Sequence, residues 1–112
     1  MMSPTDAMNT AYQALAQRAW DTNRTRAAEL AALVTAWGRT GVLAAEQRER
    51  GRSIAHSLRG SAGTFGHDDA ADAADELERI LASESGDLPL DVVESLVARI
   101  EAALTDAPDL AF

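Results

Sequence analysis

The 112-residue sequence contains no cysteine, no lysine and few aromatic residues, which make up 4% of the chain. Without cysteine it can form neither a disulfide framework nor a thiolate metal site. No apolar run approaches the roughly 20 residues that span a bilayer, and the first ten residues lack the basic start and apolar middle of a secretory signal. We therefore expect a cytoplasmic protein that does not enter a membrane.

Positive charge is also scarce, since ten arginines stand against 18 acidic residues and the formal net charge is −8. A surface of this sign repels a phosphate backbone, so we expect no nucleic-acid partner. Hydrophobic residues at 46% and charged residues at 25% are the proportions of a globular chain. At this length one core is expected, so we predict a single domain over residues 1–112 with its core at about 6–105. We also expect a monomer.

The residue types favour helix nearly throughout, because alanine, leucine, glutamate and arginine dominate and β-branched residues are few. A long first helix is predicted over residues 6–37, with a kink or break near Thr22 as the alternative because residues 21–24 are polar. Apolar residues recur at intervals of three or four, as one face of a helix requires. These positions are Tyr12, Leu15, Ala19, Ala27, Leu30, Val34, Trp37, Leu43, Ile54, Leu58, Ala62, Phe65, Ala70, Ala74, Leu77, Leu81, Val93, Leu96, Val97, Ile100 and Leu104.

Turn signals divide the chain into four helices. The stretch GRTG at residues 38–41 ends the first helix, and the second is predicted from about Val42 to Gly66. Asp68 is the expected cap of the third helix, and Pro89 is expected in the first turn of the fourth. Residues 106–112 are predicted to be a frayed tail. Four amphipathic helices with short connections bury their apolar faces most simply as an all-α, antiparallel up-down four-helix bundle.

The second predicted helix carries His56 opposite its apolar face. At about 100° per residue, His56 lies roughly 200° from both Ile54 and Leu58, so we expect its side chain to be exposed. Gly60 and Gly63 lie in the same predicted helix, where each glycine costs about 1 kcal/mol of stability relative to alanine. Their presence has a functional explanation, because backbone without side chains beside an imidazole lets another protein come close. The residues on the histidine's side of the helix are Arg52, Arg59, Gly60 and Gly63.

The stretch AHSLRGSAGTFG resembles the signature of histidine-containing phosphotransfer domains. In that signature a histidine is followed by a basic residue at plus three, glycine at plus four, small residues next and glycine at plus ten. The matching residues are His56, Arg59, Gly60, Ser61, Ala62 and Gly66, followed by Leu77 and Glu78 where the family has leucine and then glutamate or glutamine. The match covers about residues 42–82. This chain departs from the family pattern at two positions, since it has Arg59 where lysine is more usual and Ala70 where the family often has leucine.

The geometry of a helical hairpin adds a check that does not depend on the family. If the second and third helices turn at about residue 67, positions whose numbers average 67 lie at the same height, which brings Glu78 beside His56. A carboxylate there accepts a hydrogen bond from the imidazole Nδ1–H and leaves the Nε2 lone pair free as a nucleophile.

The resemblance implies a carrier in a multistep two-component phosphorelay. His56 would accept a phosphoryl group from a receiver-domain aspartate and pass it to another receiver, in a response regulator or hybrid kinase, while Arg59 neutralises charge on the phosphoryl group. We expect no cofactor and no enzyme activity of its own, because the chain has neither a phosphate-binding loop nor kinase motifs. The residues expected to support His56 are Arg59, Glu78, Gly60 and Ser61, and those expected at the docking surface are Arg52 and Gly63.

Other interpretations stay open from the sequence alone. A non-phosphorylated helical adaptor that binds signalling proteins would share the fold without the chemistry. The dimerisation hairpin of a sensor histidine kinase is a weaker alternative, because that histidine is commonly followed by an acidic residue and by proline at plus five, where this chain has Ser57 and Ser61. His67 and its neighbours predict a helix-capping turn rather than a metal site.

Overall fold

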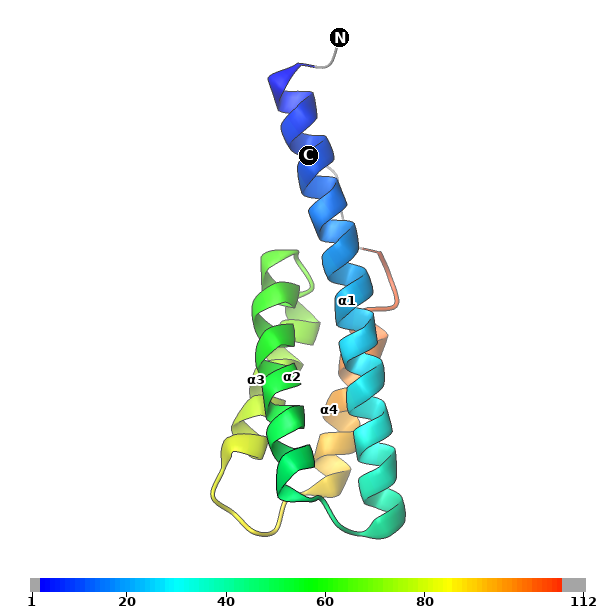
Figure 1. Ribbon diagram of the computed structural model, residues 1–112, viewed down its shortest axis with the longest axis vertical. Helices are drawn as coiled ribbons and strands as arrows, with labels where there is room; N and C mark the ends of the chain where they lie inside the picture. Colours follow the sequence, from blue (N-terminus) through cyan, green and yellow to red (C-terminus); the bar gives the residue numbers. More distant parts are fainter. Residues whose placement is uncertain (1–2, 108–112) are drawn as a thin grey trace.

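The computed structural model describes residues 3–107 as four α-helices joined by short connections (Figure 1). The helices are α1 (Pro4–Thr40), α2 (Ala45–Thr64), α3 (Asp68–Ala82) and α4 (Leu90–Ala103). Successive helices run in opposite directions, and they pack in a ring in which α1 contacts α2 and α4 while α3 contacts the same two helices. The predicted all-α antiparallel bundle is confirmed. Of the predicted tail at 106–112, all but the first two residues lie outside the described residues.

Helix α1 is longer than predicted at both ends. It begins at Pro4 because the Oγ of Ser3 accepts the backbone N–H of Asp6 at 3.1 Å. It ends where Gly41 adopts a left-handed φ of 76° and donates its N–H to the carbonyl of Trp37 at 2.7 Å. Its first turns extend beyond the other three helices, which gives the molecule its elongated shape of 59 × 22 × 20 Å (Figure 1).

The possible break near Thr22 does not occur, because the polar residue at the seam is satisfied by hydrogen bonds. Asn23 is 1% exposed, and its Nδ2 donates to the Oγ of Ser61 on α2 at 3.1 Å. Its Oδ1 accepts from Nη1 of Arg26 at 2.9 Å. A buried amide with both ends paired carries no desolvation penalty large enough to interrupt the helix, so α1 runs on for 37 residues.

The α2–α3 turn sets the register of the hairpin. Helix α2 ends at Thr64, two residues before the predicted end, and Gly66 takes a φ of 87°. The N–H of His67 then donates to the carbonyl of Ala62 at 2.8 Å, the bond that closes a Schellman motif. The prediction that Asp68 caps α3 is wrong, because His67 holds the N-cap position. Asp68 is instead the first helical residue, where a carboxylate still interacts favourably with the helix dipole.

Two other helix starts differ from the sequence prediction by a few residues. Helix α2 begins at Ala45 rather than near Val42, because the Oγ1 of Thr40 accepts the Val42 N–H at 3.2 Å and holds the chain in a turn. Helix α4 begins at Leu90, so Pro89 occupies the N-cap position rather than the first turn.

The core lies between the four helices and contains most of the predicted apolar positions. Leu15 is an exception at 54% exposed, and the neighbouring Ala16 is fully buried instead. Leu15 is therefore on a side of α1 that the bundle does not cover, although α1 still meets the end of α2 here, where the ring centroids of Tyr12 and Phe65 lie 5.7 Å apart. The predicted positions that are buried are Ala27, Leu30, Val34, Trp37, Ile54, Leu58, Ala62, Ala70, Ala74, Leu77, Leu81, Val93, Leu96, Val97, Ile100 and Leu104.

Arg48 fastens the end of the α2–α3 hairpin opposite the turn. Its Nε donates to the carbonyl of Leu81 at 2.9 Å and its Nη1 to that of Ser85 at 3.0 Å, and its Nη2 reaches the carbonyl of Ser83. These carbonyls belong to the last turn of α3 and the residues after it, which have no partners within the helix. One guanidinium group therefore fixes α3 against α2 at that end.

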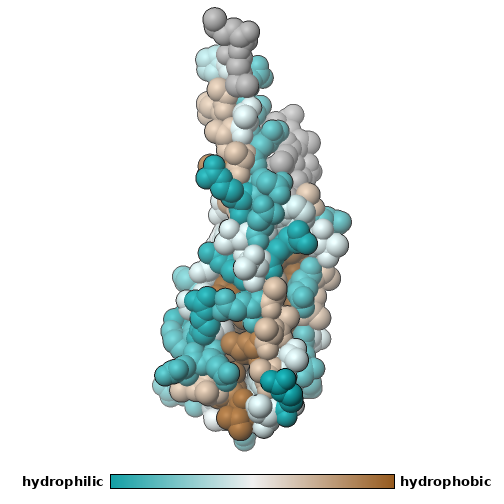
Figure 2. All heavy atoms as spheres, turned by 45° about the vertical axis from the view of Figure 1, so that its right-hand side comes forward, coloured by the Kyte–Doolittle hydropathy of each residue, from teal (hydrophilic) through white to brown (hydrophobic). Residues whose placement is uncertain are grey.

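The face of the molecule drawn in Figure 2 is mainly hydrophilic. On this face, hydrophobic atoms form small patches over the lower half of the bundle. Within residues 3–107, no helix combines the length and apolar character that a membrane crossing requires.

Candidate functional site

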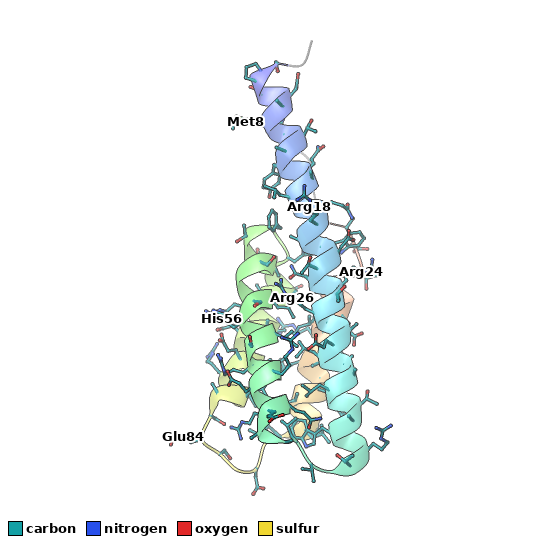
Figure 3. All side chains as sticks on the ribbon, in the orientation of Figure 1. Met8, Arg18, Arg24, Arg26, His56 and Glu84 are labelled. Atoms are coloured by element: carbon teal, nitrogen blue, oxygen red, sulfur yellow. The ribbon has the colours of Figure 1, made fainter. Side chains whose placement is uncertain are left out.

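His56 lies midway along α2, on the side of that helix that faces away from α1 (Figure 3). Its neighbours Ala55 and Leu58 are fully buried, whereas 59% of the His56 side chain is exposed. The exposure predicted from the helix geometry is therefore confirmed. An imidazole in this position is open to a second protein.

The imidazole is held by a carboxylate from the neighbouring helix. Nδ1 of His56 lies 2.7 Å from Oε2 of Glu78 on α3, whose side chain is only 13% exposed. An ionised carboxylate can only accept, so in the neutral imidazole Nδ1 is the nitrogen that carries the proton and Nε2 has the lone pair. No hydrogen bond to Nε2 is formed within the described part of the chain. The predicted contact is confirmed, and it leaves the outer ring nitrogen available as a nucleophile.

Two arginines on α2 approach the same carboxylate. Nη1 of Arg59 lies 3.5 Å from Oε1 of Glu78 and 3.1 Å from Oδ1 of Asp75. Nη1 of Arg52 lies 3.8 Å from Oε2 of Glu78, while its Nη2 is 2.6 Å from a carboxylate oxygen of Glu49. Both arginines therefore lie on the histidine's side of α2, as predicted, and both are already paired with carboxylates.

Asp75 is a member of this cluster that the sequence analysis missed. Its carboxylate accepts from Nη2 of Arg79 at 2.5 Å and from Nη1 of Arg59 at 3.1 Å. These hydrogen bonds, first that from Arg79 and then that from Arg59, hold the pKa of the Asp75 carboxyl below its usual range. The hairpin register contains the signal for this contact, because 59 and 75 average 67, as 56 and 78 do.

The two glycines on the histidine's side of α2 have different surroundings. Apart from its own helix, Gly60 has no described atom within 4 Å of the position that a Cβ would take. A Cβ on Gly63 would lie 3.6 Å from the Cβ of Ala71 on α3, an ordinary van der Waals contact. The bare surface beside His56 is therefore centred on Gly60, and Gly63 lies at the contact between two helices.

Two other residues from the sequence analysis lie apart from His56. The Oγ of Ser61 accepts from Asn23 on α1 at 3.1 Å, so Ser61 faces the helix seam rather than the imidazole. His67 lies at the α2–α3 turn, where its Nε2 donates to the carbonyl of Asp106 at 3.2 Å. Among residues 3–107, no group of three or more histidine, aspartate or glutamate side chains is arranged to hold a metal ion.

Comparison with known proteins gives one match. The model of the Hpt domain family matches residues 9–109. No curated protein and no solved structure matches the chain. Hpt domains are helical bundles with a histidine phosphotransfer role in phosphorelays, and the four-helix bundle described above agrees with that architecture. Because the match covers most of the sequence, the chain belongs to the Hpt domain family.

Proposed function

We propose that this chain accepts a phosphoryl group on Nε2 of His56 from a receiver-domain aspartate and passes it to a second receiver domain. The observation that carries the proposal is the exposed imidazole with its Nδ1 held 2.7 Å from Glu78, inside the region that the family model matches. It is the arrangement that a phosphate-accepting histidine needs, since the outer nitrogen is accessible and, in the neutral imidazole with Nδ1–H bound to Glu78, carries the lone pair.

The transfer requires one nucleophile and no bond changes elsewhere in the chain. The Nε2 lone pair forms a bond to phosphorus as the phosphorus–oxygen bond of the aspartyl phosphate breaks, and the electron pair returns to the aspartate carboxylate. Nδ1 keeps its proton, so the phosphorylated ring is positively charged. The carboxylate of Glu78 faces that charge and stabilises it. Attack by a second receiver's aspartate on the same phosphorus reverses these steps.

Arg59 is the positive group nearest in sequence on the histidine's side of α2, one helix turn further along. A phosphoryl group brings about two negative charges. In this proposal the Arg59 guanidinium neutralises part of that charge during transfer and in the phosphohistidine. Arg52, one turn before His56 and 3.8 Å from Glu78, adds a second positive charge on the same face.

The partner approaches over the bare surface at Gly60. Because apart from its own helix no described atom lies within 4 Å of the missing Cβ, the backbone of another protein can come close to α2 one turn from His56. In this proposal the receiver supplies the aspartyl phosphate, and the chain supplies the acceptor.

A transfer assay separates this function from a purely adaptor role. A panel of purified receiver domains, phosphorylated with radiolabelled acetyl phosphate, is mixed with the full chain, and the label on the chain is tested for the acid lability of phosphohistidine. We expect acid-labile label on the chain and its loss when unphosphorylated second receivers are added. Receiver binding without any label on the chain would reject the proposal in favour of the adaptor.

A further inference from the structure

The guanidinium group of Arg59 is directed at α3 rather than at the imidazole. Its Nη1 donates to Oδ1 of Asp75 at 3.1 Å and forms an ion pair with Oε1 of Glu78 at 3.5 Å, and both carboxylates belong to α3. The side chain is still 44% exposed. It is therefore paired, but at a position from which it can move into solvent.

Asp75 has a second cation that does not depend on Arg59. Arg79 lies one turn further along α3, and its Nη2 is 2.5 Å from Oδ2 of Asp75, whereas Arg59 binds Oδ1. When Arg59 leaves, the aspartate still keeps one arginine. Its ionised form is favoured by both partners, since they lower the pKa of its carboxyl. Release of Arg59 therefore leaves no carboxylate unpaired.

We infer that Asp75 is a positioning residue that holds Arg59 on α3 in competition with a phosphoryl group on His56, and so keeps the phosphohistidine less stable than Arg59 alone would make it. This inference rests on the proposed function. An acceptor that must pass its phosphoryl group on benefits from such competition, because a phosphohistidine bound too firmly by arginine would not give the group up. Asp75 acts only through Arg59 and does not touch the reacting atoms.

The size of the effect follows from the exposure of the pair. Exposed arginine–carboxylate pairs change equilibria by roughly two- to fivefold. Removing the charge of Asp75 should therefore raise the equilibrium constant for phosphohistidine formation by about threefold. A change of this kind is thermodynamic, so the test measures an equilibrium rather than a rate.

Phosphoramidate is a donor that makes the measurement independent of any receiver. Nε2 of His56 forms its bond to phosphorus as the donor's phosphorus–nitrogen bond breaks, and ammonia leaves with that electron pair. The zwitterionic donor and the neutral imidazole become ammonia and a phosphorylated imidazolium, so charge balances. Phosphorus NMR of the full chain at fixed ammonium concentration and fixed pH gives the ratio of phosphohistidine to free donor.

Four variants separate the proposed role from a general effect of charge. Asp75→Asn keeps the shape of the side chain and should raise the equilibrium constant about threefold. Glu76→Gln, on the exposed residue next to it, makes the same change in net charge and should leave the constant unaltered. In an Arg59→Gln background, Asp75→Asn should have no effect, because the arginine through which it acts is gone.

The equilibrium constants of these variants decide whether Asp75 acts through Arg59. A rise with Asp75→Asn that persists in the Arg59→Gln background would show a through-space charge effect and overturn the positioning role. If Asp75→Asn alone does not raise the equilibrium constant although phosphohistidine still forms, this inference is overturned and the proposed function stands. If the wild-type chain forms no phosphohistidine with phosphoramidate or with phosphorylated receivers, the proposed function fails and this inference fails with it.

Discussion

Gly60 offers a substitution whose effects on stability and on function should have opposite signs. It is an exposed glycine inside α2, and apart from its own helix no described atom lies within 4 Å of the place where a Cβ would be. Gly60→Ala therefore adds a methyl group to solvent and removes the backbone entropy of glycine. We expect the free energy of unfolding to rise by about 0.5–1 kcal/mol, or the melting temperature by about 2–4 °C for a chain of this size.

The larger variant tests why a destabilising residue is present there. Gly60→Leu also favours helix, but its side chain covers the surface one turn from His56. We expect phosphoryl transfer from a phosphorylated receiver to slow by about tenfold, equivalent to roughly 1.4 kcal/mol of lost binding in the complex. Labelling by phosphoramidate should not change, because that small donor needs no protein surface.

The control for an added leucine is Ala98→Leu on α4, the helix diagonally opposite α2 in the ring. It should leave transfer from the receiver unchanged. Circular dichroism melts and stopped transfer reactions provide both readouts for all three variants. Transfer to Gly60→Leu at the wild-type rate would refute the role assigned to the bare surface, and a lower melting temperature for Gly60→Ala would refute the claim that the space is open.

Three further results are expected. Glu78→Ala should slow phosphotransfer to His56 by about 10- to 100-fold, since a hydrogen bond to a charged group contributes about 1.5–3 kcal/mol; unchanged rates in the transfer assay would disprove the contact's role. Arg48→Ala should lower the free energy of unfolding by about 2 kcal/mol in urea melts, because several carbonyls after α3 lose their donor; an unchanged midpoint would contradict this. The arginine partners of Asp75, Arg79 first, lower its carboxyl pKa, so the folded chain binds fewer protons than the unfolded chain. That stabilisation is complete above about pH 4 and is lost as pH falls further, and Asp75→Asn should flatten the pH dependence of the urea midpoint there.

Much of the site follows from the sequence because it lies on one regular hairpin. Once the turn is placed at residue 67, helix geometry alone brings Glu78 to His56. The same register also predicts the Arg59–Asp75 pair. The sequence analysis missed this pair only because it did not apply the register to Arg59. The angle around a helix also excludes Ser61 from the histidine's face, since five residues turn the helix by about 140° beyond one full turn.

Other features of the fold depend on where the helices and loops begin and end. The periodicity of apolar residues does not predict those positions. Leu15 continues the apolar repeat of α1, yet it is 54% exposed while the adjacent Ala16 is fully buried, so the buried side of α1 shifts by one residue near the end of the bundle. The start of α2 is set by one side-chain hydrogen bond from Thr40 within the loop. The bonds of Arg48 need the loop after α3 to take one conformation, and an arginine in the sequence does not specify that conformation.

The central claim is that His56 is the residue that carries the phosphoryl group. The most direct measurement compares the wild-type chain with His56→Gln and His67→Gln after each is mixed with the same radiolabelled phosphoreceiver. Glutamine is tolerated in a helix and the His56 side chain is 59% exposed, so the helical circular dichroism spectrum should be intact in both variants. We predict acid-labile label on the wild type and on His67→Gln and none on His56→Gln, whereas label on a folded His56→Gln chain would contradict the assignment.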